Sequence, residues 1–197
     1  MEVPPPEDQA LLAGIADRDP EAFQALMERY GRPVLNIAFR LLNSRPDAEE
    51  VAQEVFFRLY QQPPRLDPSS KLFTWIYRVT INRCLDLVRR RKRTPPMVSL
   101  DATLEQEEPE GQTFAEKLPH PSTLTPQEQA VRSELAAATR RAISTLPEKL
   151  RVPLILSTFD ELSQEEIGQT LGLTPKAVER RIARARELLK ARLQPYL

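Results

Sequence analysis

The stretch ELSQEEIGQTLGLTPKAVERRIARAR, residues 161–186, decides how the C-terminal part of the chain folds. Ser163, with Glu166 three residues later, forms a capping box and predicts the start of one helix. Gly172 suits the left-handed residue that ends a helix, and Thr174 followed by proline predicts the start of the next. Two short helices joined by such a tight turn are typical of a helix-turn-helix, whose second helix enters the major groove of DNA. The apolar residues predicted to close its core are Ile167, Leu171, Leu173, Val178 and Ile182.

Charge is segregated along the chain although the net charge is zero. Residues 1–93 carry +2, residues 94–128 carry −6 and residues 129–197 carry +4. The helix predicted over 175–192 holds seven basic and two acidic side chains. Because the Debye length is about 8 Å at physiological salt, local charge rather than the total governs attraction to phosphates. We therefore expect this helix to bind nucleic acid.

The composition favours packed helices and argues against several classes of protein. Hydrophobic residues make up 41% of the 197, only five residues are glycine, and alternating β-branched runs are absent from the sequence, so strands are not expected. The single cysteine excludes a disulfide framework, and Cys84 is predicted to be a buried apolar residue. His120, the only histidine, lies in a Pro-rich stretch, so we expect no metal-binding or catalytic role. The sequence holds no P-loop and no nucleophile-elbow motif, so neither an enzyme nor a cofactor is expected.

The sequence carries no recognisable sorting signal. Its first residues, MEVPPPEDQALL, have neither the basic start nor the apolar centre of a signal peptide. Apolar runs stay well below the roughly 18 residues of a membrane-spanning helix. A soluble, cytoplasmic protein is expected.

The first structured block, about residues 8–93, predicts three long helices. Asp19 followed by proline starts the first, whose apolar residues recur at three- and four-residue steps. Pro33 is expected to kink or interrupt this helix. Pro46 opens the second helix, and QQPPRLDPSS, residues 61–70, must be a loop. The third helix is predicted over 71–93.

The remaining chain divides into a linker and a second helical block. Residues 94–124 are rich in proline and glutamate and are interpreted as a linker. Thr125 starts a second capping box that predicts a helix to about residue 145, and a further helix is predicted over 147–159, bent early at Pro153. The expected fold is all-α, with a domain over 1–93, a linker over 94–124 and a helix-turn-helix domain over 125–197.

Three segments resemble the bacterial sigma-70 family of RNA polymerase sigma factors. AFQALMERYGRPVLNIAFRLLNSRPDAEEVAQEVFFRLYQ, residues 22–61, resembles the first part of sigma domain 2, and FTWIYRVTINRCLDLVRRRKR, residues 73–93, is similar to its promoter-melting helix. LPEKLRVPLILSTFDELSQEEIGQTLGLTPKAVERRIARARELL, residues 146–189, resembles sigma domain 4. Two domains joined by a short linker are typical of the extracytoplasmic-function (ECF) group. The resemblance implies a stress-response initiation factor that recruits core RNA polymerase to promoters and opens them.

The resemblance implies that residues 47–58, DAEEVAQEVFFR, dock on a coiled coil of the polymerase β′ subunit. From spacing alone, an amphipathic helix with a solvated acidic face would be the simpler account. A polar rim around an aromatic anchor suits a specific protein contact. The residues assigned to core polymerase are Asp47, Glu50, Gln53, Glu54 and Phe57.

The family likeness also assigns the helix over 71–93 to the promoter −10 element, which is captured as a single strand. Loop 61–70 would form a pocket for a flipped base, with Arg78 and Asn82 beside it. From the residues alone, Phe73 and Trp75 are predicted to be core and the basic end of the helix to complement its C-terminal dipole. The residues assigned to −10 DNA are Arg78, Asn82, Arg83, Arg89 and Arg90.

The second helix of the helix-turn-helix is assigned to the −35 element. Arginine can hold guanine O6 and N7 with two hydrogen bonds. Glu179 departs from the lysine common in the family, and its carboxylate can accept from cytosine or pair with a neighbouring arginine. Arg186 and Lys190 are expected to meet phosphate or solvent. The residues assigned to −35 DNA are Thr174, Lys176, Ala177, Glu179, Arg180, Arg181 and Arg184.

The partners implied are the β′ and β subunits of core polymerase, double- and single-stranded promoter DNA, and an anti-sigma factor. The acidic linker would thread near the polymerase active-site cleft, or serve only as a solvated spacer. Outside its complexes the protein is expected to be a monomer. The alternative is a conventional repressor or activator with a helix-turn-helix, which usually dimerises to match two half-sites.

Overall fold

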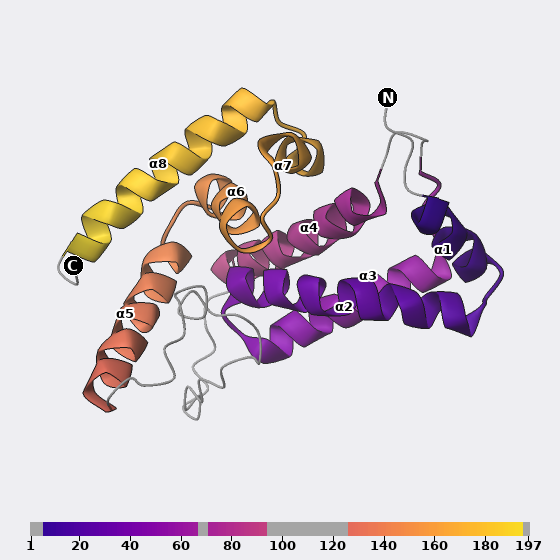
Figure 1. Cartoon of the computed structure of the whole chain (residues 1–197), viewed down its shortest axis with the longest axis horizontal. Helices are drawn as coiled ribbons and strands as arrows, with labels where there is room; N and C mark the ends of the chain where they lie inside the picture. The colour runs from indigo at the N-terminus through magenta and orange to yellow at the C-terminus, as the bar shows by residue number, and fades with distance from the viewer. Residues whose placement is uncertain (1–5, 67–70, 94–125, 195–197) are drawn as a thin grey trace. The chain divides into compact units, whose positions relative to one another are not determined.

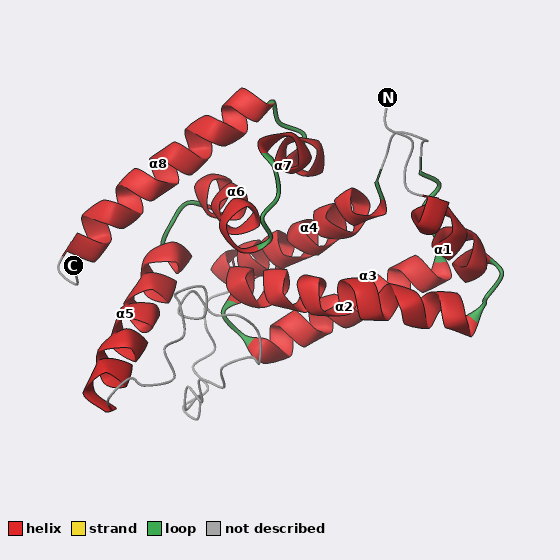
Figure 2. Ribbon diagram, viewed as in Figure 1, coloured by secondary structure: helices red, strands yellow, loops and turns green. Residues whose placement is uncertain are grey.

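The computed structural model describes residues 6–66, 71–93 and 126–194, and these residues fold into helices without any strand (Figures 1 and 2). They divide into two compact units, one holding the first four helices and the other holding the fifth, the sixth, the eighth and most of the seventh. This confirms the all-α fold. The helices are α1 (Pro6–Ala16), α2 (Pro20–Leu42), α3 (Arg45–Gln61), α4 (Leu72–Arg93), α5 (Pro126–Ser144), α6 (Glu148–Phe159), α7 (Gln164–Leu171) and α8 (Pro175–Leu193).

Helix α2 is the centre of the N-terminal unit, since it packs against α1, α3 and α4. It begins as predicted: the Asp19 carboxylate accepts the Glu21 backbone N–H at 2.9 Å, and Pro20 takes the first helical position. It ends at Asn43, which adopts the left-handed conformation. Its buried stripe is Leu26, Tyr30, Val34, Ile37, Ala38 and Leu41.

Of the two effects expected at Pro33, a kink or an interruption, the interruption does not occur, because α2 runs through this residue. A proline inside a helix removes one backbone hydrogen bond and crowds the preceding turn. Tyr30 and Val34, on either side of it, are both buried in the same stripe. Their packing outweighs the local preference of one residue, and the helix stays continuous.

Helices α3 and α4 begin close to their predicted positions. Pro46 lies in the first turn of α3, and α4 starts at Leu72. Residues 62–66 have no helical structure, in agreement with the predicted loop over 61–70, whereas residues 67–70 lie outside the described part. Cys84 is fully buried on α4, as predicted.

Phe73 and Trp75 correct an expectation, since both are half-buried rather than core residues. The buried stripe of α4 is set by a helical period that includes Leu72, Ile76 and Tyr77. Positions 73 and 75 fall on the flanks of this stripe. The sequence shows that this helix is rich in aromatic residues, but it does not show which ring faces the core.

Helix α1 was not predicted as an element. Its start is acidic and proline-rich, and no helix was predicted from it. It nevertheless packs on α2, with Ile15 fully buried and Gly14 so close that a Cβ there would lie 2.6 Å from that of Ala22. The N-terminal unit is therefore a three-helix bundle with a fourth helix against it.

The C-terminal unit confirms the helix-turn-helix in detail. Ser163 accepts the Glu166 N–H at 3.2 Å while the Glu166 carboxylate accepts the Ser163 N–H at 3.0 Å, which is the complete capping box. Gly172 ends α7 with φ of 66°, and Thr174 caps α8. Ile167, Val178 and Ile182 are buried, whereas Leu171 and Leu173 are only half-buried.

Helices α5 and α6 also match the predicted elements. Thr125 of the expected capping box, His120 and the expected linker over 94–124 lie outside the described residues. Arg151 of α6 donates to the Ser144 carbonyl at 3.0 Å, and Arg192 of α8 donates to the Thr145 hydroxyl at 2.7 Å. Both guanidinium groups thus meet the C-terminal end of α5, where helix carbonyls favour positive charge. Among the described helices, none is long and apolar enough to span a membrane.

Candidate nucleic-acid interface and docking groove

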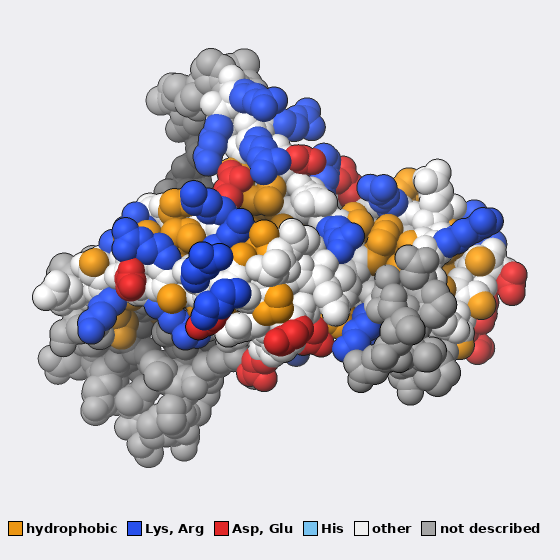
Figure 3. All heavy atoms as spheres, turned by 90° about the horizontal axis from the view of Figure 1, so that it is seen from above, with side chains coloured by type: hydrophobic (Ala, Val, Ile, Leu, Met, Phe, Trp, Pro, Cys, Tyr) orange, Lys and Arg blue, Asp and Glu red, His pale blue; other side chains and the backbone are white. Residues whose placement is uncertain are grey.

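Helix α8 divides cleanly into a buried and a basic face. Val178, Ile182 and Ala185 are buried. Lys176, Arg180 and Arg184 are exposed at four-residue spacing, so they form one stripe along the other side. In the space-filling view, Lys and Arg side chains gather on the surface over this helix (Figure 3). The stripe has the charge and the regular spacing that a groove-reading helix needs.

Two acidic residues moderate the charge of this stripe. Glu179 accepts from Lys176 Nζ at 2.8 Å, and Glu187 accepts from Arg184 Nη1 at 2.8 Å. Of the two uses proposed for Glu179, pairing is the one observed, but its partner is a lysine rather than an arginine. Such exposed pairs contribute little to stability, so DNA can replace them at small cost.

The remaining residues assigned to −35 DNA lie at the start and on the flank of α8. The Thr174 hydroxyl oxygen accepts the Ala177 backbone N–H at 3.3 Å, so Thr174 caps the helix. Ala177 and Arg181 are half-exposed beside the stripe. The structure therefore gathers all seven residues on the first three turns of one helix.

Helix α4 carries an exposed polar stripe opposite its buried one. Arg78 and Asn82 are exposed four residues apart, followed by Asp86 and Arg89, which pair at 3.7 Å. Arg90 is also exposed in the last turns of the helix. Cations and an amide along one helix suit contact with a nucleic-acid strand.

Arg83 differs from its neighbours because it binds Glu54 of α3 through two hydrogen bonds. Its Nη2 lies 2.6 Å from Glu54 Oε1, and its Nε donates to the second carboxylate oxygen. The hydrogen bond to Glu54 raises the pKa of the Arg83 guanidinium, against a smaller lowering effect of burial. A residue assigned to DNA and a residue assigned to polymerase are thus partners in the same ion pair.

A second ion pair links the first turn of α3 to the last turn of α4. Arg91 Nη2 of α4 lies 2.6 Å from Asp47 Oδ1 of α3, and the Asp47 side chain is only 14% exposed. Burial raises the pKa of Asp47, but hydrogen bonds from Arg91 and Ser44 and the Arg91 charge together hold it below its usual value. Asp47 is therefore a charged residue that joins α3 to α4.

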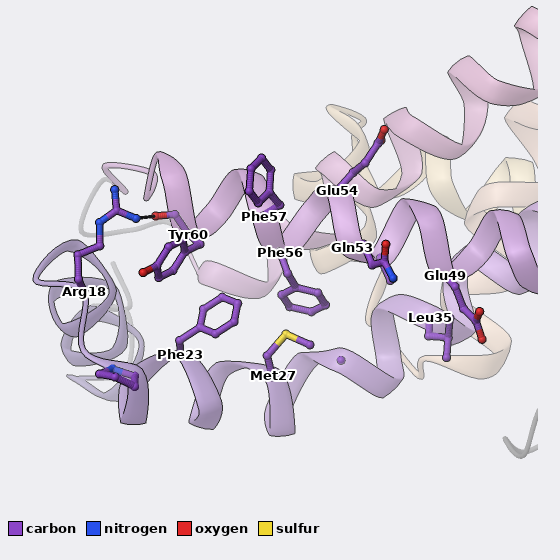
Figure 4. Close-up of a pocket in the computed structure, with 13 residues that line it drawn as sticks. Arg18, Phe23, Met27, Leu35, Glu49, Gln53, Glu54, Phe56, Phe57 and Tyr60 are labelled. Carbon is purple, nitrogen blue, oxygen red and sulfur yellow. Dashed lines mark hydrogen bonds between the residues drawn. The ribbon is translucent and has the colours of Figure 1, made fainter.

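A groove of about 1090 Å³ runs between α2 and α3, and its lining is mainly apolar. Phe23 and Tyr60 meet edge to face at one end, with ring centroids 5.2 Å apart. Figure 4 shows Met27 of α2 and Phe56 of α3 pointing toward each other across it. Arg18 closes this end by donating to the Tyr60 carbonyl at 2.8 Å, with its guanidinium 4.6 Å from the Tyr60 ring.

Phe57 stands at the rim of this groove and is 61% exposed. In Figure 4 it projects from α3 away from α2, whereas Phe56 points into the groove. Glu50 and Gln53 are exposed on the same helix. Of the five residues assigned to polymerase, these three are open to a partner, while Asp47 and Glu54 also hold α4.

Sequence reasoning missed the part of this surface that belongs to α2 and to the turn before it. Phe23 and Met27 belong to the apolar residues that recur at three- and four-residue steps and were therefore expected to be buried, yet Met27 is 38% exposed and Phe23 is half-buried. In the described part of the chain, His, Cys, Asp and Glu form no cluster that could hold a metal ion.

Comparison with known proteins gives two family matches, "Sigma-70 region 2" over residues 26–94 and "Sigma-70, region 4" over residues 136–189. The RNA polymerase sigma-H factor of Pseudomonas aeruginosa is 32% identical over 192 residues, 97% of this chain and 96% of its own length. The ECF RNA polymerase sigma factor SigW of Bacillus subtilis is 34% identical over 176 residues, 89% of this chain and 91% of its own. The ECF RNA polymerase sigma-E factor of Escherichia coli is 32% identical over 190 residues, 96% of both chains.

Two solved structures share the fold. CnrH in complex with the cytosolic domain of CnrY matches with a TM-score of 0.67 and 25% identity, over 96% of this chain and 98% of that one. The sigma factor RpoE in complex with the anti-sigma factor NepR from Bartonella quintana matches with a TM-score of 0.60 and 17% identity, over 87% and 96%. The second likeness concerns the fold alone.

The described residues form helices only, and they include a helix-turn-helix, a further helix with an exposed basic stripe and an apolar groove. Together these features fit the class of DNA-binding transcription factors. The chain belongs to the sigma-70 family of RNA polymerase sigma factors, in the ECF group. It is a transcription initiation factor that binds core polymerase and directs it to promoters. A conventional dimeric repressor or activator is not favoured, because it would leave the match to region 2 without explanation.

Proposed function

We propose that the outward face of α3 and the adjoining groove bind the β′ coiled coil of core polymerase, and that α8 and α4 then contact promoter DNA. The observation that carries this proposal is the exposure of Phe57 beside an apolar groove. An apolar surface of this kind on a single chain marks a protein contact, and aromatic residues supply much of the energy in such contacts. Exposed Glu50 and Gln53 provide the polar rim.

The two ion pairs refine the assignment of individual residues. Glu54 binds Arg83 and Asp47 binds Arg91, so both carboxylates hold α4 against α3 in the free protein. We assign Phe57, Gln53 and Glu50 to direct contact with polymerase. Glu54 and Asp47 then act at the border between the polymerase-binding and DNA-binding faces.

The DNA contacts are assigned by helix. The stripe of α8 that contains Arg180 and Arg184 is proposed to read the −35 element in the major groove. The exposed stripe of α4 that contains Arg78 and Asn82 is proposed to steady the opened −10 strand. Arg83 takes part only if its pair with Glu54 opens.

The remaining partners follow from the family. We propose that an anti-sigma factor covers part of the polymerase-binding surface, because the groove and Phe57 expose apolar area in the free chain. The β subunit and the linker over 94–124 are proposed to meet inside the holoenzyme. The protein is expected to act as a monomer in the cytoplasm, where polymerase meets DNA.

A change at Phe57 tests the polymerase contact. Phe57→Ser should lower the affinity for core polymerase by about tenfold or more, as loss of an aromatic anchor does. Because the ring is exposed, the free energy of unfolding should change by less than about 0.5 kcal/mol. Titration of core polymerase with labelled protein and urea unfolding measure the two quantities.

Phe57→Leu is the matched variant, since it keeps an apolar side chain at the rim and should recover most of the affinity. An affinity of Phe57→Ser equal to that of the wild type would refute the docking assignment. The DNA-reading assignments are separate from it and would be tested by transcription from a genomic library with purified core polymerase.

A further inference from the structure

Asp8 is a buried carboxylate that no part of the proposed function uses. It lies on α1 and is only 2% exposed. Its Oδ2 accepts the Leu72 backbone N–H at 3.2 Å, and its Oδ1 lies 3.3 Å from the Tyr30 hydroxyl and 3.5 Å from Arg29 Nη1. Leu72 is the first residue of α4, so Asp8 caps this helix from 64 residues away. A buried carboxylate is costly unless it is bonded, and here it is bonded to a helix start.

Arg18 makes the complementary contact at the end of α3. It lies in the turn that follows α1 and donates to the Tyr60 carbonyl at 2.8 Å, next to the last residue of α3 (Figure 4). Its guanidinium also covers the Tyr60 ring at 4.6 Å. Arg18 has φ of 63°, a left-handed conformation that side chains other than glycine seldom adopt. Arg18 keeps this conformation while its side chain contacts Tyr60, which lies 42 positions later in the sequence.

The charges of these two residues match the helix ends that they meet. A helix N-terminus presents unpaired N–H groups and favours negative charge, which Asp8 supplies to α4. A helix C-terminus presents unpaired carbonyls and favours positive charge, which Arg18 supplies to α3. One short segment, residues 8–18, therefore contacts both the end of α3 and the start of α4.

We propose that α1 and Arg18 form a brace that positions the start of α4 relative to the end of α3, and that Asp8 and Arg18 are positioning residues for promoter opening. This inference rests on the proposed role of α4 at the −10 element. The bundle core also packs α2 directly against α3 and α4, so the two polar contacts are not the only links between these helices. They fix the ends of the helices, less than two turns before Arg78, the first residue of α4 assigned to the opened strand.

The brace is tested in the intact holoenzyme with variants that keep the backbone relaxed. Asp8→Asn keeps the size of the side chain and removes its charge. Arg18→Gly removes the guanidinium and suits the positive φ, whereas Arg18→Lys keeps a cation that can still donate to Tyr60. Asp17→Asn is the matched control, because Asp17 is an exposed carboxylate in the same turn.

Three quantities are measured for each variant on a promoter that wild-type holoenzyme transcribes. They are the permanganate reactivity of unpaired thymines, the affinity for a duplex that ends upstream of the −10 element, and the affinity for core polymerase. Arg18→Gly removes a charge-assisted hydrogen bond and should lower the open-to-closed ratio by about tenfold. Asp8→Asn turns such a bond into a neutral one and should lower the ratio by about threefold to tenfold. For Asp8→Asn the other two affinities should stay within about twofold. Because Arg18 also lines the groove assigned to polymerase, opening by Arg18→Gly is compared at saturating core polymerase. Arg18→Lys should recover most of the opening, and Asp17→Asn should behave as wild type.

The brace is overturned if opening by Asp8→Asn and Arg18→Gly equals that of Asp17→Asn. It is also overturned if core affinity, upstream binding and thermal stability all fall in parallel with opening, since that pattern means only a loss of folding. Failure of the wild-type holoenzyme to open any promoter would instead refute the proposed function. The two failures are therefore distinguishable.

Discussion

Asp47 shows how burial and pairing act in opposite directions on one carboxyl group. Its surroundings remove most of its contact with water, which raises its pKa. Hydrogen bonds from Arg91 and Ser44 and the positive charge of Arg91 more than offset this effect. The net result is a pKa below the usual 3.8, so the ionised form is favoured by folding.

This shift predicts a pH dependence of stability. Since the folded pKa lies below the unfolded one, the contribution of Asp47 is complete above pH 3.8 and is lost as the pH falls through the folded value. Asp47→Asn should lower the free energy of unfolding by about 1 kcal/mol near pH 7, and the difference should vanish at strongly acidic pH. Urea unfolding at several pH values measures it.

Asp86→Asn is the control for this experiment, because Asp86 is an exposed carboxylate on α4. It should change stability little at any pH. A constant difference between wild type and Asp47→Asn from pH 7 to pH 2.5 would contradict the assignment of the shift to Asp47.

The contacts of a single residue were predictable where its partner lies close by in the sequence. The caps at Asp19, Ser163 and Thr174 are read from neighbours two or three positions away, and all three form as expected. The Glu54–Arg83 and Asp47–Arg91 pairs join residues 29 and 44 positions apart. Nothing in spacing distinguishes such a pair from two exposed charges, so the sequence assigned these residues to separate surfaces.

At the scale of elements, the turn between α7 and α8 depends on a close approach of backbone at Gly168. Its carbonyl accepts the N–H groups of Gly172 and Leu173, the latter at 2.9 Å. A Cβ on Gly168 would lie 2.6 Å from the Leu173 carbonyl oxygen, which is backbone and has no flexible end to move aside. The angle between the two helices thus requires glycine at this position.

Gly168→Ala should therefore destabilise the C-terminal unit by about 1–3 kcal/mol, the usual cost of forcing extra volume into a packed site. Trp75, the only tryptophan, lies on α4 and reports on the N-terminal unit, whereas circular dichroism follows all helices. The unfolding midpoint measured by circular dichroism should fall, whereas the midpoint measured by Trp75 fluorescence should not change. Binding of the holoenzyme to −35 DNA should be lost.

Gly172→Asn is the matched variant, because no atom lies within 4 Å of a Cβ there and asparagine tolerates a left-handed backbone. It should cost less than about 1 kcal/mol, because the left-handed conformation costs most residues roughly 1–2 kcal/mol and asparagine less. Equal losses of stability in the two variants would show that the close backbone approach at Gly168 is not the reason why this position requires glycine.

The elements were predictable where periodicity and caps agree, as in α2, α4 and α8. Helix α1 escaped notice because its ordering depends on Asp8, which meets α4, on Gly14, which meets α2, and on the burial of Ile15, and no local pattern reveals these contacts. Pro33 was given too much weight for the same reason, since the surrounding core decided the outcome. Long-range packing, rather than local preference, accounts for both errors.

For the whole molecule, a net charge of zero conceals a strongly uneven distribution. Helix α8 alone holds most of the cations of the C-terminal unit, and its buried face leaves them on the side open to DNA. Attraction to phosphate depends on this local array, because charges beyond about 8 Å are screened at physiological salt. DNA binding should therefore be strongly dependent on salt even though the chain is neutral.

Two changes on α8 separate reading of bases from attraction to phosphate. Arg180→Ala should relax preference at one position of the −35 element by about 1–3 kcal/mol. Lys190→Ala should weaken binding to all sequences alike and lower the salt slope by about one. Holoenzyme binding to single-base variants at several salt concentrations measures both. Equal, sequence-independent losses in the two variants would contradict the distinction.

The two-domain plan and the family were predictable at this scale, because region 2 and region 4 each carry a long local signature. The docking groove was not, since it is built from α2 and α3 together and takes its shape from Met27, Phe56 and Tyr60. The sequence named Phe57 as an anchor but could not describe the surface beside it.

The burial of Cys84 has a practical consequence for both biology and experiment. Alkylating reagents and oxidants cannot reach its sulfur while the N-terminal unit is folded, so a chemical signal of this kind has to act through another molecule. For the same reason, one cysteine introduced on the surface would be the only thiol available to a maleimide dye. Distance measurements between fluorophores in the assembled holoenzyme can therefore begin from the natural chain without first removing any residue.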